Sequence, residues 1–136
     1  MYVDPTASEL LDQPAHRALA KEVAVQGITL LKNEGGLLPM RSLASTAKKK
    51  KSSTVVAVLG PLGDSVHAMI GQSGYAMPGA RVVTVQRAVA AAGHAVLAAD
   101  GANVINEDQS GIAAAVALIP KAELVLLVLG ENQVRK

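Results

Sequence analysis

The sequence lacks cysteine, phenylalanine and tryptophan altogether. Without cysteine the chain has no disulfides, thiolate zinc sites or cysteine nucleophiles, although this absence indicates no particular cellular compartment. Tyr2 and Tyr75 are the only aromatic residues, so few ring faces are available for stacking against sugars or nucleic-acid bases. No apolar run approaches the roughly eighteen residues of a membrane-spanning helix, and we therefore predict no membrane span.

Charge of either sign is also scarce, since 18% of the 136 residues are charged and the formal net charge is +2. The run Lys48–Lys51 exceeds that whole excess, so we expect no nucleic-acid partner. The N-terminal stretch MYVDPTASELLD has no basic region followed by an apolar one, so no signal peptide is visible and the compartment stays open. Half of the residues are apolar, which is enough for the buried core of one domain.

A helix is predicted near the N-terminus. Asp12 suits its cap, and Pro14 suits the first turn, where the missing N–H of proline costs nothing. One helical face is formed by Ala20, Val23, Ala24 and Gly27. We expect the helix to end at this glycine and residues 28–31, ITLL, to form a short apolar strand, which is ended by Gly35, Gly36 and Pro39.

Three further apolar runs, 55–59, 95–99 and 124–129, are continuous rather than alternating in polarity. Strands of this kind are buried on both faces, as in parallel sheets covered by helices. We therefore predict that all three are mutually parallel strands of one sheet. Two helical stripes lie between them, formed by Val85, Ala88, Val89 and Ala92 and by Ile112, Ala115, Val116 and Ile119.

The ends of these two predicted helices carry their own signals. Gly93 is expected to end the first helix; Asn106 or Ser110 is expected to cap the second, and Pro120 to lie beyond its end. The resulting order is α-β-linker-β-α-β-α-β. It predicts an α/β fold with a doubly wound, mainly parallel sheet flanked by helices.

Motifs for phosphate cofactors are missing. GPLGDS, after the first of the three runs, does not match the dinucleotide-binding G-x-G-x-x-G, and its Pro61 removes a backbone donor; a P-loop is absent too. Asp64 alone does not make the acidic cluster of a phospho-receiver domain. The histidines have no metal spacing and are expected to be structural or exposed: His16, His67 and His94. No G-x-S-x-G elbow is present to anchor a Ser/His/Asp triad. We expect neither a cofactor nor a metal.

Two segments fall outside these elements. Residues 41–53, RSLASTAKKKKSS, form a polar, low-complexity linker, which we interpret as a solvated lysine-rich loop rather than an anion-binding or targeting patch. The stretch Gly60–Arg81 is too long for a routine connection between a strand and a helix. It is either a functional loop or a covering flap packed by Met69, Ile70 and Met77.

Several motifs together resemble one family. HRALAKEVAVQGITLLKNEGGLLPM is similar to the start of the C-terminal α/β sandwich domain of glycoside hydrolase family 3, the β-glucosidases and β-xylosidases. VVAVLGPLGDS, MIGQSGYAMPGARVVTVQRAVAAAG and GIAAAVALIPKAELVLLVLGEN resemble three later stretches of that domain, in the family's order. The resemblance covers nearly the whole chain apart from the lysine-rich loop. It implies that residues 14–136 are a partial, incomplete α/β sandwich domain and that 1–13 are the remnant of an interdomain linker.

The sequence departs from the family pattern at three places. Val85 stands where the family usually has proline, Glu123 stands where it has aspartate, and the lysine-rich loop lengthens a gap that is normally short. Lys32 and Asn33 are family hallmarks, to which we assign a role in shaping the end of the predicted strand rather than in catalysis.

The resemblance implies a retaining β-glycosidase that acts on terminal β-glucosides or β-xylosides without a cofactor. Such enzymes need two carboxylates about 5 Å apart. The family's nucleophile lies on a preceding barrel domain, which is missing here. Its acid/base glutamate commonly comes from a loop beyond the last strand present, in a stretch that is not found here. Some members place it directly after that strand, where this chain has Glu131, and an exposed glutamate at a strand end is the alternative.

We therefore expect this chain to be catalytically inactive alone and to self-associate through faces that later elements would cover. Its partners in the intact enzyme would be the barrel domain and a carbohydrate substrate. The alternative function is a non-catalytic α/β binding or interaction module. Glucoside and xyloside preference cannot be separated, because the selecting residues lie largely in the absent domain.

Overall fold

The computed structural model describes residues 13–39, 53–70 and 82–131. The chain divides into two compact units, Met1–Arg41 and Ser42–Lys136. Apart from Ser53, the predicted lysine-rich loop at 41–53 lies outside the described ranges, as do residues 71–81 of the long predicted loop. Within the described ranges, no helix has the length and apolar character needed to cross a membrane.

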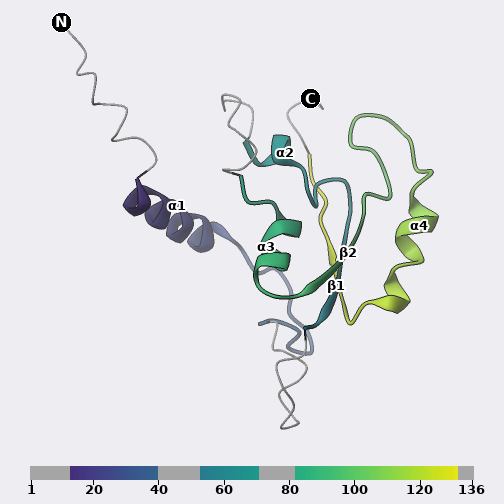
Figure 1. Cartoon of the computed structure of the whole chain (residues 1–136), viewed down its shortest axis with the longest axis horizontal. Coiled ribbons are helices and arrows are strands. Elements are labelled where there is room, and N and C mark those ends of the chain that lie inside the picture. The colour runs from purple at the N-terminus through teal and green to yellow at the C-terminus, as the bar shows by residue number, and fades with distance from the viewer. Residues whose placement is uncertain (1–12, 40–52, 71–81, 132–136) are drawn as a thin grey trace, which may run out of the picture. The chain divides into compact units, whose positions relative to one another are not determined.

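The first unit contains helix α1, Pro14–Gly27 (Figure 1). Pro14 is its first residue and Gly27 its last, which confirms both predictions for the ends of this helix. The N-cap position falls on Gln13, whose side chain makes no capping hydrogen bond, so the cap is not the predicted Asp12. Asp12 itself lies outside the described residues.

The predicted strand at residues 28–31 is wrong. Ile28 is extended, with φ −75° and ψ 122°, but residues 28–31 form no strand. A β-strand exists through hydrogen bonds to a neighbouring strand, and none of the described residues supplies one here. The apolar composition therefore identified an extended segment, but it could not show whether a neighbouring strand is present to pair with it.

Asn33 closes the turn that follows this segment. Its side-chain amide donates to the carbonyl oxygen of Leu38 at 2.8 Å, and its Oδ1 accepts from the Leu38 N–H at 2.9 Å. The side chain thus pairs with both polar groups of one peptide residue, as a neighbouring strand would. Gly35 and Gly36 have φ of 78° and 67°, a backbone conformation that side-chain-bearing residues rarely adopt. The K-N-x-G-G motif accordingly builds a tight turn, and Asn33 shapes this turn rather than the end of a strand.

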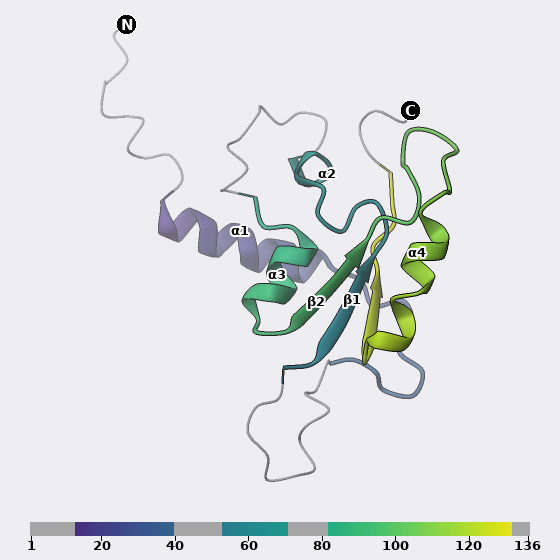
Figure 2. The same ribbon diagram turned by 45° about the vertical axis from the view of Figure 1, so that its right-hand side comes forward.

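The second unit is built around a three-stranded sheet of β1 (Val55–Leu59), β2 (Ala95–Ala99) and β3 (Leu124–Leu127) in the order β2-β1-β3 (Figure 2). Both pairings are parallel, which confirms the predicted arrangement. In this register Leu59 lies level with Ala99 on one side and with Leu127 on the other. The carboxyl ends of all three strands therefore meet at one edge of the sheet.

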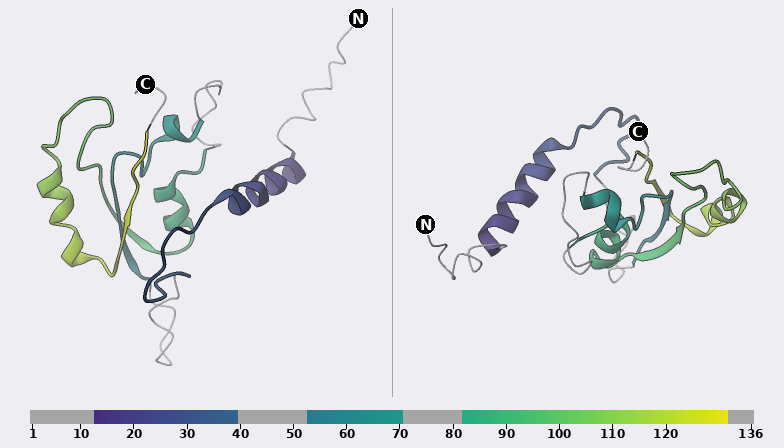
Figure 3. Two further views of the ribbon diagram at one scale, coloured as in Figure 1. Left: turned by 180° about the vertical axis from the view of Figure 1, so that it is seen from behind. Right: turned by 90° about the horizontal axis from the view of Figure 1, so that it is seen from above.

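Helices flank both faces of this sheet. They are α2 (Val66–Ile70), α3 (Val85–Ala91), α4 (Ile112–Val116) and a 3₁₀ turn, η3 (Ile119–Lys121). Helix α3, in the crossover from β1 to β2, lies on one face, and α4, in the crossover from β2 to β3, lies on the other (Figures 2 and 3). The incomplete α/β sandwich predicted for this region is confirmed.

The core is centred on β1, whose Val56, Ala57, Val58 and Leu59 are all buried. The two outer strands are less buried than their continuous apolar sequences predicted, because each forms an edge of the three-stranded sheet. On β3 and just beyond it, Leu127 and Leu129 are each 64% exposed. This side of the unit therefore presents an uncovered apolar surface.

The cap predicted for the second stripe is also wrong, since α4 has Gly111 at its N-cap position and no side-chain cap. Asn106 and Ser110 are both engaged elsewhere. The Asn106 Oδ1 accepts from the Asp108 N–H at 3.0 Å, and the Ser110 hydroxyl bonds the Asp108 carboxylate. Each side chain thus stabilises the loop before the helix instead of the helix itself.

Candidate ligand site at the carboxyl edge of the sheet

At the carboxyl edge of the sheet, the neighbouring strands β1 and β2 send their loops to opposite faces (Figure 3). The chain leaves β1 toward α3 on one face of the sheet and leaves β2 toward α4 on the other (Figure 3). Where two neighbouring strands send their loops to opposite faces, a crevice opens between the loops, and open α/β sheets bind ligands there. The loop residues that form this crevice follow Leu59 and Ala99.

Gly60 fixes the start of the first loop. Its N–H donates to Ala99 O at 3.0 Å, and beside it the Val128 N–H donates to Leu59 O at 2.7 Å, so all three strand ends are joined. The φ of Gly60 is 107°, and a Cβ there would lie 2.3 Å from Val128 O. Only glycine fits this position without a shift of the backbone.

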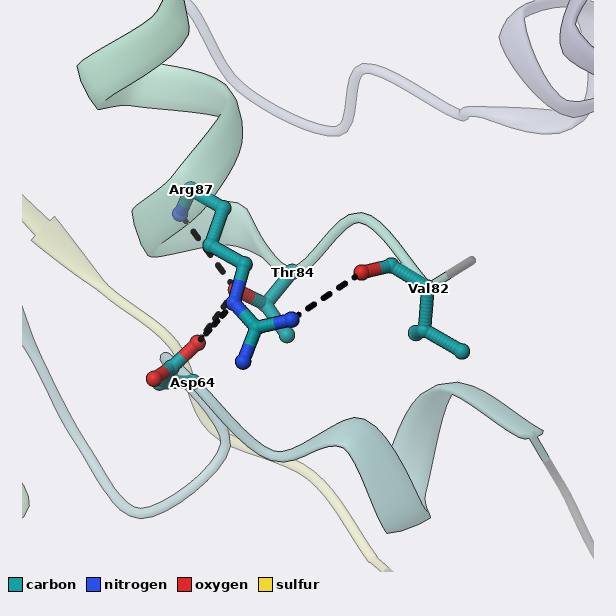
Figure 4. A network of polar contacts seen from close by, with 4 residues as sticks. All are labelled: Asp64, Val82, Thr84 and Arg87. Carbon is teal, nitrogen blue, oxygen red and sulfur yellow. Dashed lines mark hydrogen bonds and ion pairs between the residues drawn. The ribbon is translucent and has the colours of Figure 1, made fainter. Parts of the chain in front are cut away.

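A polar cluster of Asp64, Thr84 and Arg87 holds the far end of the same loop against α3 (Figure 4). The fully buried Thr84 donates its hydroxyl to Asp64 Oδ1 at 2.5 Å and accepts from the Arg87 N–H at 3.3 Å, as the N-cap of α3. The Arg87 guanidinium Nε lies 3.3 Å from the same carboxylate oxygen. We define these three residues as the loop clamp. The sequence analysis considered Asp64 only as part of a phospho-receiver cluster, which it does not complete, whereas its described contacts are structural.

The second loop, residues 100–111, is ordered by its own amide and carboxylate side chains. Asn103 Oδ1 accepts from the Ile105 N–H at 2.7 Å, and Asp108 Oδ1 accepts from the Ser110 N–H at 2.9 Å. Bonds from the Ser110 N–H and hydroxyl hold the pKa of Asp108 below its usual range. These bonds to backbone N–H groups make successive short turns.

Two glycines bring the ends of this second loop together. Gly101 has φ of 74°, and a Cβ on Gly111 would lie 3.0 Å from the Gly101 carbonyl oxygen. The loop therefore returns on itself directly above the end of β2. This return leaves the Asp100 side chain at the mouth of the crevice.

The crevice between the two loops is a pocket of about 170 Å³, which we call the switch crevice. Its lining consists of Pro61, Leu62, Ser65, Asp100, Ala102, Asn103, Val104 and Ile105. A neighbouring polar pocket of about 210 Å³ shares Asp100, Ala102 and Asn103 with it. Asp100 is thus the carboxylate common to both pockets. The sequence analysis did not select Asp100. Its position one residue after a predicted parallel strand was the available signal.

A third hollow of about 280 Å³ lies between α4 and the sheet and is lined almost entirely by apolar side chains. Ile112, Val116 and Ile119 contribute from the helical side, and Leu127 and Leu129 contribute from β3 and its extension. This hollow coincides with the uncovered apolar surface of the fold. Asp100 is the one charged residue among its described lining residues.

The acid/base candidate Glu131 is exposed, at the end of the described part of the chain that follows β3. It comes four residues after the level of Leu59 in the sheet, whereas Asp100 comes one residue after it on the opposite outer strand. Two strand spacings and three residues of rise separate them, so their backbones lie more than about 10 Å apart. Asp100 and Glu131 thus follow opposite outer strands, with β1 between them.

The three histidines belong to different elements: His16 is on α1, His67 is on α2 and His94 lies just before β2. Within residues 13–39, 53–70 and 82–131, no group of three His, Cys, Asp or Glu side chains is placed to hold a metal ion. Carboxylates, an amide and a hydroxyl at the carboxyl edge are therefore the polar groups available for binding.

The amino-acid sequence is similar to several curated glycosidases. It is 32% identical to probable β-D-xylosidase 7 of Arabidopsis thaliana over 90% of this chain and 15% of the relative. It is 29% identical to the exo-1,4-β-xylosidase xlnD of Aspergillus niger, over 95% of this chain and 15% of the relative. It is 31% identical to a periplasmic β-glucosidase of Salmonella typhimurium, over 97% of this chain and 20% of the relative. No protein-family model matches the chain. The chain spans 15 to 20% of the length of these relatives.

Proposed function

Because this chain belongs to the β-xylosidases and β-glucosidases of glycoside hydrolase family 3, we propose that it forms part of a retaining β-glycosidase acting on terminal β-xylosides or β-glucosides. The observation that carries this proposal is the identity of about 30% to both kinds of enzyme over nine-tenths of the chain or more. We assign residues 14–136 to part of the second, α/β domain of such an enzyme and residues 1–13 to a linker before it. The flanked parallel sheet supports this assignment.

Retention requires a nucleophilic carboxylate and an acid/base carboxylate about 5 Å apart. Asp100 and Glu131 follow the two outer strands on either side of β1, an arrangement that does not present them as that pair. We therefore place the nucleophile on a barrel domain outside this chain. Glu131 remains the acid/base candidate, since it extends beyond the carboxyl edge of the sheet into solvent, and an exposed strand-end glutamate is the alternative.

By itself the chain is then expected to be inactive toward β-glycosides, because a lone carboxylate has no nucleophilic partner. It is also expected to self-associate through the exposed apolar side chains beside β3, with Leu127 and Leu129 foremost. Sedimentation velocity of the purified chain measures this association. A Leu127→Lys chain that remains as associated as the original would contradict the assigned surface.

The test of the proposed function is the activity of the complete polypeptide that contains these residues. We expect hydrolysis of 4-nitrophenyl β-xyloside or β-glucoside, with the β-anomer of the sugar as the first product in NMR spectra. The flanking reading frame should encode a barrel domain upstream. A folded complete polypeptide that hydrolyses neither substrate, or that releases the α-anomer first, would overturn the proposal and favour a non-catalytic binding module.

A Glu131→Gln variant separates the two interpretations of this residue. If Glu131 is the acid/base group, the variant loses most of its turnover on substrates with poor leaving groups, because these depend on protonation. If it is an exposed strand-end glutamate, turnover stays unchanged. Glu107→Gln, which makes the same change at another exposed loop position, is the matched control.

A further inference from the structure

We propose that the switch crevice binds a single uncharged sugar ring, with Asp100 accepting hydrogen bonds from its hydroxyl groups. This inference rests on the proposed function for the class of ligand. It assigns to the sugar-binding machinery a residue that lies on the opposite outer strand from Glu131. Four properties of the crevice support it: its free polar groups, its charge, its apolar wall and its size.

The polar groups of the crevice match the mixed donor and acceptor character of a hydroxyl group. The exposed Asp100 carboxylate makes no hydrogen bond or ion pair with any residue that the structure describes, so its oxygens are available as acceptors. Asn103 uses its Oδ1 for the Ile105 N–H, which leaves its amide N–H₂ able to donate. Ser65 Oγ accepts from the Ala68 N–H at 3.2 Å and keeps its own proton for donation.

The charge of the crevice selects a neutral ligand. Among the residues that the structure describes, its lining contains one carboxylate and no lysine, arginine or histidine. A phosphate or carboxylate ligand would face the Asp100 charge without a compensating cation, and like charges at such short range repel. Hydroxyl groups donate to the same carboxylate and form charge-assisted hydrogen bonds.

The apolar wall of the crevice replaces the aromatic ring that the described part of the chain lacks. Pro61 and Leu62 come from the first loop, and Val104 and Ile105 come from the second. These side chains offer a surface to the C–H face of a pyranose ring. The polar and apolar groups thus line one pocket, as a sugar with two kinds of face requires.

The walls are held in place and the space is small. Gly60 joins the first loop to two other strand ends, and the loop clamp fixes its far end. A preorganised wall reduces the entropy lost on binding. The volume of about 170 Å³ lies below the roughly 300 Å³ at which pockets begin to bury drug-sized ligands, so a single terminal sugar fits better than an oligosaccharide.

The test is an NMR titration of the ¹⁵N-labelled 136-residue chain with methyl β-D-xyloside and methyl β-D-glucoside. We expect saturable shifts confined to the amides of residues 60–65 and 100–105. Asp100→Asn should weaken binding about tenfold or more, because a hydrogen bond to a charged acceptor is lost. Glu107→Gln changes the same charge in the same loop but does not line the crevice, and it should leave the affinity unchanged.

Several results would overturn the inference. They are an absence of saturable shifts in a folded chain, an Asp100→Asn variant that binds as tightly as the original, or a response in this loop to Ca²⁺ or inorganic phosphate that exceeds the response to the sugars. Binding by the isolated chain is measured without hydrolysis. A complete polypeptide that fails to hydrolyse glycosides therefore refutes the proposed function and leaves the binding result to be judged by itself.

Discussion

Replacing Gly60 with alanine should destabilise the second unit more than any other single glycine change with a comparable φ. The new Cβ would lie 2.3 Å from Val128 O, a main-chain atom that cannot rotate away. The φ of 107° adds strain of about 1–2 kcal/mol for a residue with a side chain. Displacement of this backbone also weakens two hydrogen bonds, Gly60 N–H to Ala99 O and Val128 N–H to Leu59 O, of about 0.5–1.5 kcal/mol each.

The expected loss is therefore roughly 2–5 kcal/mol in the free energy of unfolding. Gly93→Ala is the matched control, since Gly93 also has a positive φ, 89°, but its added Cβ would meet nothing within 4 Å. That variant should lose only the strain of about 1–2 kcal/mol. The difference between the losses of the two variants separates the effect of the contact with Val128 from the effect of the backbone conformation.

Urea denaturation followed by circular dichroism at low protein concentration gives both free energies. In thermal melts, 1 kcal/mol corresponds to about 4–8 °C for a unit of this size, so Gly60→Ala should melt at least about 10 °C lower. Equal losses for the two variants would refute the reasoning, because they would mean that the three strand ends do not meet closely at Gly60.

Three further outcomes are expected. Thr84→Val should lower the free energy of unfolding, measured by urea denaturation, by about 1–3 kcal/mol, because it removes the buried hydroxyl that bonds Asp64 and caps α3. Thr84→Ser keeps the hydroxyl and should lower it clearly less. Equal losses for the two variants would contradict the loop clamp. Replacing Lys48–Lys51 by serine should change the free energy of unfolding within about 0.5 kcal/mol, and a larger loss would mean that the run is packed or paired. The pKa of the Asp108 carboxyl, measured by ¹³C NMR, should lie below the usual aspartate range. Its loop bonds therefore stabilise the fold above the unfolded pKa, and this stabilisation is lost as pH falls through the folded pKa. Ser110→Ala should raise the pKa of Asp108, and an unshifted pKa would contradict the loop geometry.

The candidate site was less predictable from the sequence than the fold. Glu131 was selected because the resemblance pointed to the segment after the last strand, and it does lie at the carboxyl edge. Asp100 was not selected, because no local motif marks it. Its importance comes from the opposite directions in which the chain leaves β1 and β2, and that is a property of the sheet.

Local patterns were sufficient wherever one segment carries its own signal. Proline and glycine fix backbone angles whatever surrounds them, so the ends of α1 were correct at Pro14 and Gly27. Continuous apolar runs identified three strands, and their parallel pairing followed from the helical stripes between them. The family resemblance also resided in the order of motifs along the chain.

Only the tertiary structure decided features that depend on partners distant in sequence. Residues 28–31 have a strand-like composition, but pairing needs a neighbour, and none lies within the described residues. Asn106 and Ser110 were equally good caps by residue type, but both bond the loop that precedes α4. Backbone propensity is a property of each residue, whereas a pocket, or a hydrogen bond between distant residues, exists only when two separate segments meet. For the switch crevice these two segments begin about forty residues apart, at Gly60 and Asp100.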